Sequence, residues 1–139
     1  DGIIKEDDGI IETPLGRSRE FRKKIVVAST SKKMSKTFFK VIERFKNATY
    51  LEVKPYTGRT HQIRVHLAYI GHPVIGDVEY GKVAAGGKSS EIAKRQLLHA
   101  SNIKFIHPTS KKRVEFSAPL PEDFKSALKF LKNEKNNNF

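Results

Sequence analysis

The residues best suited to chemistry lie close together, just after Gly58. Thr60 follows at a position where a hydroxyl residue often begins a helix. The free N–H groups of that first turn and the positive end of the helix dipole would then open beside Arg59, which suits a phosphate. Arg64 follows Ile63 and leaves the helix at the rim of its apolar stripe. From there a guanidinium can bind a partly buried carboxylate or a phosphate through two parallel hydrogen bonds. Two ordinary solvated arginines are equally compatible with the spacing.

The histidines do not have the spacing of a metal site. His61 and His66 are five residues apart, which places them about 140° apart around a helix. No His-Glu-x-x-His or Cys/His spacing occurs, and the chain contains no cysteine. The Gly-x-Ser-x-Gly turn of Ser/His/Asp hydrolases is also missing from the sequence, as are the glycine-rich fingerprints of nucleotide-binding sites. We therefore expect no metal, and structural roles for these histidines.

Basic residues dominate the charge of the chain. Lys and Arg number 27 against 15 Asp and Glu, which gives a formal net charge of +12 and a pI of about 10.0. Many of them interleave with short apolar runs near the start, a pattern typical of a groove that binds a nucleic-acid backbone. An acidic protein, an anionic membrane or a merely solvated surface is the alternative. The residues expected to contact an RNA backbone are Arg17, Arg19, Arg22, Lys23, Lys24, Lys32, Lys33 and Lys36.

Hydrophobic periodicity predicts an α+β fold, in which an antiparallel or mixed sheet carries a short packed helix and a C-terminal helix. Pro14 is expected to end the first strand, and Gly71 the first helix. Within that helix, Ile63, Leu67 and Ile70 recur at helical spacing and are expected to face the core. The expected strands cover 9–15, 25–27, 37–45, 49–54, 96–105 and 113–117, the expected helices begin at 60 and 121, and a loop covers 71–90.

The length of the chain suits a single domain or a large piece of one. Residues 1–132 are assigned to that domain, and the polar residues 133–139 to a flexible tail. No apolar run approaches the ~20 residues of a spanning helix, and the first residues lack signal-peptide character. We therefore expect no membrane partner and a cytoplasmic location.

Residues 57–67 read Thr-Gly-Arg-Thr-His-Gln-Ile-Arg-Val-His-Leu, followed by Gly-His-Pro and then by Gly-Asp-Val-Glu-Tyr-Gly. This segment closely resembles the signature of RNA pseudouridine synthases typified by ribosomal large-subunit pseudouridine synthase A. Other blocks resemble the same family in the same order, so the likeness extends over most of the chain. These blocks are residues 9–16, 36–41, 96–100, 107–109 and 118–121.

The resemblance implies that the chain is part of a pseudouridine synthase catalytic domain. Members of the family isomerise uridine to pseudouridine in folded RNA, here rRNA or tRNA, after flipping the base out of its stack. They use no metal and no organic cofactor. Matched onto this sequence, Arg64 would hold the catalytic Asp and Leu98 would contact the flipped base. The turn near the substrate would be built by Arg59, Thr60, His61 and Gln62.

The sequence departs from the family at the nucleophile. The family's Asp motif begins His-Arg-Leu-Asp, and no Arg-Leu-Asp occurs in this chain. Asp77 does not replace it, because it belongs to the Gly-His-Pro loop. The chain is therefore interpreted as the C-terminal part of a synthase domain whose N-terminal half, with the Asp, is the missing partner. We expect the isolated chain to be inactive. The alternative function is a non-catalytic basic RNA-binding module.

Overall fold

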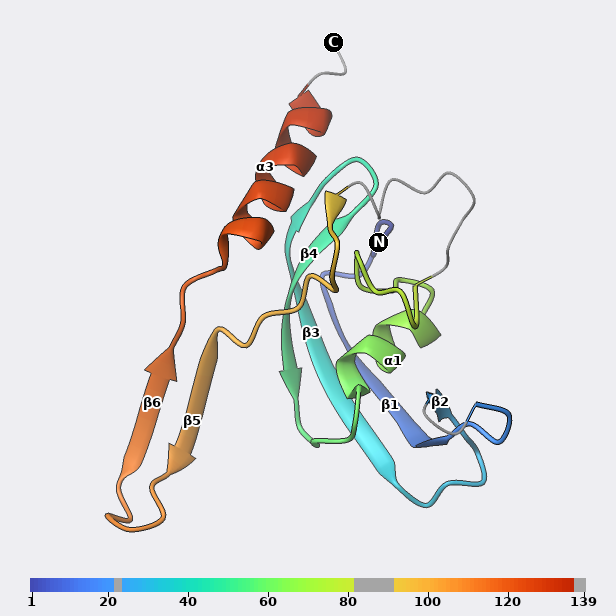
Figure 1. Cartoon of the computed structure of the whole chain (residues 1–139), viewed down its shortest axis with the longest axis vertical. Helices are drawn as coiled ribbons and strands as arrows, with labels where there is room; N and C mark the ends of the chain where they lie inside the picture. Colours follow the sequence, from blue (N-terminus) through green and yellow to red (C-terminus); the bar gives the residue numbers. More distant parts are fainter. Residues whose placement is uncertain (22–23, 82–91, 137–139) are drawn as a thin grey trace.

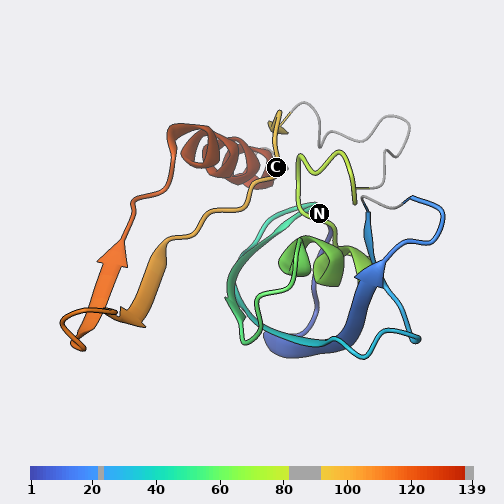
Figure 2. The same cartoon turned by 60° about the horizontal axis from the view of Figure 1, so that its bottom comes forward.

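A four-stranded antiparallel sheet forms the largest layer of this computed structural model, which describes residues 1–21, 24–81 and 92–136. The strand order is β2-β1-β3-β4, and Figure 2 shows the sheet curving around helix α1. A separate two-stranded hairpin and a C-terminal helix lie to one side (Figure 1). The elements are β1 (Asp8–Arg17), β2 (Ile25–Val27), β3 (Met34–Arg44), β4 (Thr49–Pro55), α1 (Gln62–Tyr69), β5 (Asn102–Ile106), β6 (Arg113–Ser117) and α3 (Glu122–Asn136).

The strands of the sheet follow the alternating pattern of the sequence. In β1 and β3, buried and exposed side chains alternate, so that Ile11 and Phe39 face α1. The expected end of β1 at Pro14 is wrong, because the strand continues to Arg17. Pro14 is the last β1 residue paired with β3, and its carbonyl accepts a bond from Ala28 where β2 takes over. A missing N–H is tolerated at such a change of partner.

Helix α1 packs its apolar face on the concave side of the sheet. Leu67 is buried in the main core cluster, and Ile63 and Ile70 pack against it, as predicted. The helix ends where expected: Gly71 follows the C-cap residue Ile70 with φ +86°, and its N–H donates to the carbonyl of Ala68. This left-handed conformation is one that glycine adopts without strain.

The hairpin of β5 and β6 pairs with no strand of the larger sheet in the described part of the chain. The expected strand over 96–105 is shorter and later, because residues 96–101 belong to no strand and pairing begins at Asn102. The hairpin has one charged face, where Lys104 and Glu115 form an ion pair at 3.1 Å. The other face is apolar and largely exposed, and it comprises Ile103, Phe105, Val114 and Phe116.

Helix α3 begins at Glu122, one residue after the expected start, with Glu122 and Asp123 in its first turn, and it forms a second small core. Phe124 and Leu131 are buried, and the Phe124 ring lies 5.8 Å from that of Tyr50 in β4. The helix runs to Asn136, so residues 133–136 form its last turn rather than the start of the expected tail. Residues 137–139 lie outside the described residues. None of the helices in the described ranges has the length and apolar character needed to cross a membrane.

Candidate active site

The turn before α1 is held by a glutamine rather than by the expected threonine cap. Thr60 is exposed, and the N-cap position belongs to His61, which has φ 53° and no side-chain cap bond. Gln62, the first residue of the helix, holds the turn instead. Its side-chain Oε1 accepts the Arg59 N–H at 3.0 Å and the Thr57 hydroxyl at 2.7 Å. The side chain of Gln62 is therefore buried, and its hydrogen bonds hold the turn together.

A chain of buried hydrogen bonds continues from Gln62 through α1 into the sheet. The Gln62 amide donates to Thr37 Oγ1 at 2.9 Å, and Thr37 lies 2.9 Å from His66 Nδ1. On the other side of the ring, Nε2 lies 2.8 Å from Ser35 Oγ, whose hydroxyl donates to the carbonyl of Thr13. Since Thr37 accepts from Gln62 and Ser35 donates to Thr13, the imidazole accepts at Nδ1 and donates at Nε2. His66 is thus a neutral structural histidine, and burial lowers its pKa.

Arg64 lies two residues from both Gln62 and His66 along α1 and forms a two-bond ion pair with Asp77. Its Nε and Nη2 donate to the two carboxylate oxygens of Asp77 at 2.7 and 2.9 Å, and Nη2 also donates to Glu79 at 3.0 Å. The side chain of Arg64 is 12% exposed and that of Asp77 0%. Bidentate capture of a partly buried carboxylate was predicted from the position of Arg64 on the helix. The acid that holds it here, however, is Asp77 of this chain.

The geometry of the loop fixes Asp77. Its Oδ1 also accepts the N–H groups of Glu79 and Tyr80, at 3.0 and 3.1 Å. Burial alone would raise the pKa of the Asp77 carboxyl, but the bonds from Arg64 and from these two N–H groups keep it below its usual value. Just before it, Gly76 has φ +79°, and a Cβ there would collide with the Arg95 carbonyl. Asp77 is therefore an anion that permanently anchors Arg64.

Tyr80 completes this cluster. The guanidinium carbon of Arg64 lies 4.8 Å from the centre of its ring, and the ammonium of Lys24 lies 5.5 Å from it. The hydroxyl of Tyr80 lies 2.9 Å from His61 Nδ1. Sequence reasoning assigned no role to Asp77 or Tyr80. Their only signal was the Gly-Asp-Val-Glu-Tyr-Gly block in the family signature, because both contacts depend on the fold of the loop.

The other turn residues expected near the substrate are at least partly accessible. Arg59 is exposed, and its guanidinium has no hydrogen bond or ion pair with any residue in the described ranges. His61 is half-buried against Tyr80 and 3.7 Å from Glu79. Together with Thr60, these side chains form one accessible surface beside the Arg64–Asp77 ion pair.

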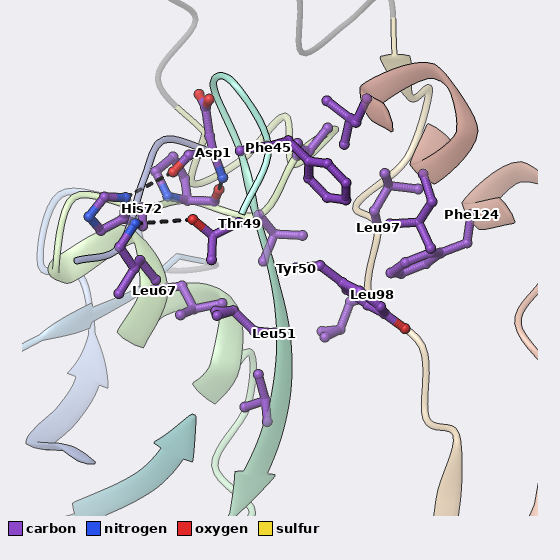
Figure 3. A pocket seen from close by; sticks show the side chains of 18 residues that line it. Asp1, Phe45, Thr49, Tyr50, Leu51, Leu67, His72, Leu97, Leu98 and Phe124 are labelled. Atoms are coloured by element: carbon purple, nitrogen blue, oxygen red, sulfur yellow. Dashed lines mark hydrogen bonds between the residues drawn. The ribbon is translucent and has the colours of Figure 1, made fainter. Parts of the chain in front are cut away.

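Leu98 lies in a different place. It lines an apolar cavity of about 100 Å³ between β4, α1, α3 and the segment that carries it. Figure 3 shows Leu98 near Tyr50, Leu97 and Phe124. Arg64 is not among the residues that line this cavity. The described part of the chain therefore does not join Arg64 and Leu98 in one pocket.

The predicted RNA-backbone residues gather at the connections of β1, β2 and β3. Arg17, Arg19, Lys32 and Lys33 are exposed. Lys36 pairs with Glu12 at 3.6 Å on the outer face of the sheet. Lys24 contacts Tyr80, and Arg22 and Lys23 lie outside the described residues. Within the described ranges, no three His, Cys, Asp or Glu side chains come close enough to hold a metal ion.

Known proteins match both the sequence and the fold. A family model described as RNA pseudouridylate synthase matches residues 3–69. The chain is 42% identical over 131 residues to an uncharacterised RNA pseudouridine synthase, YlyB, of Bacillus subtilis, covering 94% of this chain and 41% of that protein. It is 41% identical over 127 residues to ribosomal large subunit pseudouridine synthase D of Zymomonas mobilis, covering 88% of this chain and 40% of the relative.

The fold matches the solved structure of human RNA pseudouridylate synthase domain containing 1, with a TM-score of 0.73 and 28% identity. That match covers 94% of this chain and 62% of the human one. The chain thus spans about two fifths of the length of the curated relatives it matches.

Proposed function

We propose that this chain, which belongs to the RNA pseudouridylate synthase family, forms part of an enzyme that isomerises uridine to pseudouridine in structured RNA. Ribosomal RNA is the proposed substrate, because several relatives are named ribosomal large subunit pseudouridine synthases. Transfer RNA is the second candidate. A cytoplasmic location would suit both RNAs.

The observation that carries the proposal is the unused side of the Arg64 guanidinium. Asp77 and Glu79 occupy Nε and Nη2, whereas the two N–H groups of Nη1 donate to no residue in the described ranges. The hydrogen bonds that Arg64 donates to Asp77 raise the pKa of the guanidinium, so the group stays charged. A second carboxylate could therefore bind at Nη1 without displacing Asp77. We assign this position to the catalytic Asp, supplied by a part of the synthase outside these 139 residues.

The substrate would approach over the exposed turn and the basic connections. Arg59 and His61 present donors beside Arg64, and the exposed cations at 17, 19, 32 and 33 extend the positive surface along the end of the sheet. Such cations bind phosphates without reading sequence, so they would hold a folded RNA by its backbone. Leu98 would reach the flipped base only if, in the complete domain, the cavity that Leu98 lines lies close to Arg64.

The apolar face of the β5–β6 hairpin is the proposed contact with the rest of the domain. An isolated two-stranded hairpin is marginally stable in water, yet here Phe105 and Phe116 stack at 6.0 Å on a face that no described element covers. Relatives possess additional polypeptide that could cover it, since this chain accounts for 62% of the solved human one. A second copy is a poorer occupant, because two chains of charge +12 repel each other.

Tritium release from RNA labelled at uridine C5 tests the function. We expect none from the 139 residues alone, and turnover from the complete protein that contains an Asp-bearing segment.

In the complete protein, Arg64→Ala should lower kcat by about a thousandfold or more, because the catalytic carboxylate loses its fixed partner. Arg95→Ala is the matched control, since that arginine forms an exposed pair with Asp123. Robust activity of the isolated chain, or wild-type kcat in Arg64→Ala, would refute these roles. Binding without turnover by the complete protein would favour an RNA-binding module.

A further inference from the structure

Tyr80 joins three parts of the molecule that are far apart in sequence. Its hydroxyl accepts the backbone N–H of Ile25, the first residue of β2, at 3.0 Å. The same oxygen lies 2.9 Å from Nδ1 of His61, and the ring lies against the guanidinium of Arg64. It therefore connects the basic β1–β2 connection, the turn before α1 and Arg64.

The hydroxyl of Tyr80 is placed to set which nitrogen of the His61 imidazole carries the proton. Because the Tyr80 oxygen accepts from Ile25, its own proton is available for His61 Nδ1, which leaves the neutral imidazole protonated at Nε2. Burial raises the pKa of the Tyr80 phenol, so it keeps this proton at neutral pH. His61 Nε2 has no hydrogen-bond partner among the residues that the structure describes, and it is thus a donor available to a ligand.

Tyr80 also holds a backbone conformation that is otherwise unfavourable. His61 has φ 53°, in the left-handed region that side chains other than glycine seldom adopt. Such a conformation persists only where surrounding contacts favour it. The hydrogen bond to Tyr80 and the edge-on packing of the two rings, with centres 5.7 Å apart, supply these contacts.

The ring limits the movement of Arg64. Asp77 and Glu79 bind one edge of the guanidinium, and the aromatic ring covers one of its faces at 4.8 Å. Contacts on an edge and on a face together fix both the position and the tilt of a planar group. Among the contacts that the described residues make, those of Arg64 leave Nη1 to act on another ligand.

We propose that Tyr80 is a positioning residue, which orients Arg64 and the Nε2 donor of His61 for uridine isomerisation and couples both to strand β2, beside the basic connections. The inference rests on the proposed synthase function. It predicts that the hydroxyl matters even when the ring is retained, because the hydrogen bonds to His61 and Ile25 come from the hydroxyl. Tyr80 itself is not assigned a contact with the reacting base.

Tyr80→Phe in the complete synthase tests the proposal, with Tyr69→Phe as the matched control. Tyr69 lies on α1 with a 59% exposed side chain. We expect Tyr80→Phe to lower kcat by about ten- to a hundredfold, while KM changes by less than about threefold, because misorientation affects the reaction more than RNA binding. Tyr80→Leu, which also removes the ring, should lower kcat further. Tyr69→Phe should match wild type.

Nuclear magnetic resonance supplies a readout that does not depend on activity. In the wild type, His61 should show the Nε2–H tautomer and the Ile25 amide should exchange slowly; in Tyr80→Phe the tautomer should become mixed and exchange should accelerate. Wild-type kcat in Tyr80→Phe, or a loss confined to KM or to the urea midpoint, would overturn the positioning role while leaving the synthase function intact. A wild-type enzyme without turnover would instead overturn the proposed function and this inference together.

Discussion

Two arginine–aspartate pairs in this chain have nearly the same geometry in very different surroundings. Arg64 binds Asp77 through Nε and Nη2 at 2.7 and 2.9 Å, and Arg95 binds Asp123 through the same atoms at 2.6 and 2.8 Å. The first pair has side chains 12% and 0% exposed, whereas the second has 43% and 49%. Geometry alone therefore does not distinguish a candidate active-site pair from a surface contact.

The difference is what surrounds each pair. Asp77 receives two backbone N–H bonds, and Arg64 receives a second carboxylate and an aromatic ring, so removing one partner leaves a charge in a place water cannot easily reach. Around Arg95 and Asp123, water replaces a lost partner. The same contrast holds between larger parts of the molecule. The described buried polar side chains of the sheet and α1 have hydrogen-bond partners, whereas no described element covers the apolar face of the β5–β6 hairpin.

The largest effect is expected at the buried pair. Asp77→Ala should lower the free energy of unfolding by about 3–5 kcal/mol, because it leaves the Arg64 guanidinium poorly compensated in a largely buried position. Asp123→Ala should leave the free energy of unfolding close to wild type. Urea titrations followed by circular dichroism measure both. Equal losses in the two variants would show that burial does not separate the pairs.

The buried histidine gives the next largest effect. His66→Ala should lower the free energy of unfolding by about 2–4 kcal/mol, because it creates a cavity and deprives the Thr37 and Ser35 hydroxyls of their partner. His99→Ala, on the partly exposed segment before β5, is the control, with an expected loss below about 1 kcal/mol. The same urea titrations measure both losses. An unfolding free energy of His66→Ala close to that of the wild type would mean that the buried hydrogen-bond chain does not stabilise the packing of α1.

The pH dependence of stability should report the same histidine. Burial lowers the pKa of folded His66 from its ordinary value of 6.5, so below that pH the unfolded chain binds a proton that the folded chain does not. Stability contributed by His66 is thus complete above pH 6.5 and is lost as pH falls towards the folded pKa, with a slope of up to about 1.4 kcal/mol per pH unit.

Subtracting the His66→Ala curve isolates this term, because His72, whose pKa burial also lowers, is present in both proteins. Unfolding free energies measured from pH 7 to pH 5 provide the two curves. Parallel curves would show that His66 titrates alike in the folded and unfolded chains.

The smallest effect is expected on the uncovered hairpin. Phe116→Ser should change the free energy of unfolding of the isolated chain by less than about 0.5 kcal/mol, since the side chain is already 59% exposed. In the complete synthase the same substitution should cost about 2–4 kcal/mol, because the rest of the domain would bury this face. Lys104→Ser on the charged face is the control in both proteins. An equally small effect in the complete protein would exclude this face as the contact.

Local pattern predicted much of the fold. The alternating residues of β3 and β4, the three-residue strand β2, the apolar stripe of α1 and its end at Gly71 were all expected from sequence, because each depends on neighbours a few residues away. The errors occur where a distant contact overrides the local pattern. Pro14 is accommodated by a change of strand partner, and Gln62 displaces Thr60 because it can reach β3 from inside the helix.

The candidate site divides in the same way. Helical spacing predicted that Arg64 leaves the helix at the edge of an apolar face, and composition predicted a strongly basic surface, since both are local properties of the chain. The folded chain, in contrast, is needed to place Asp77, Glu79 and Tyr80 around Arg64. It also brings Thr13 to His66, 53 residues away along the chain. No periodicity encodes such pairs. They form because the sheet curves around α1 and brings together groups that must satisfy one another away from water.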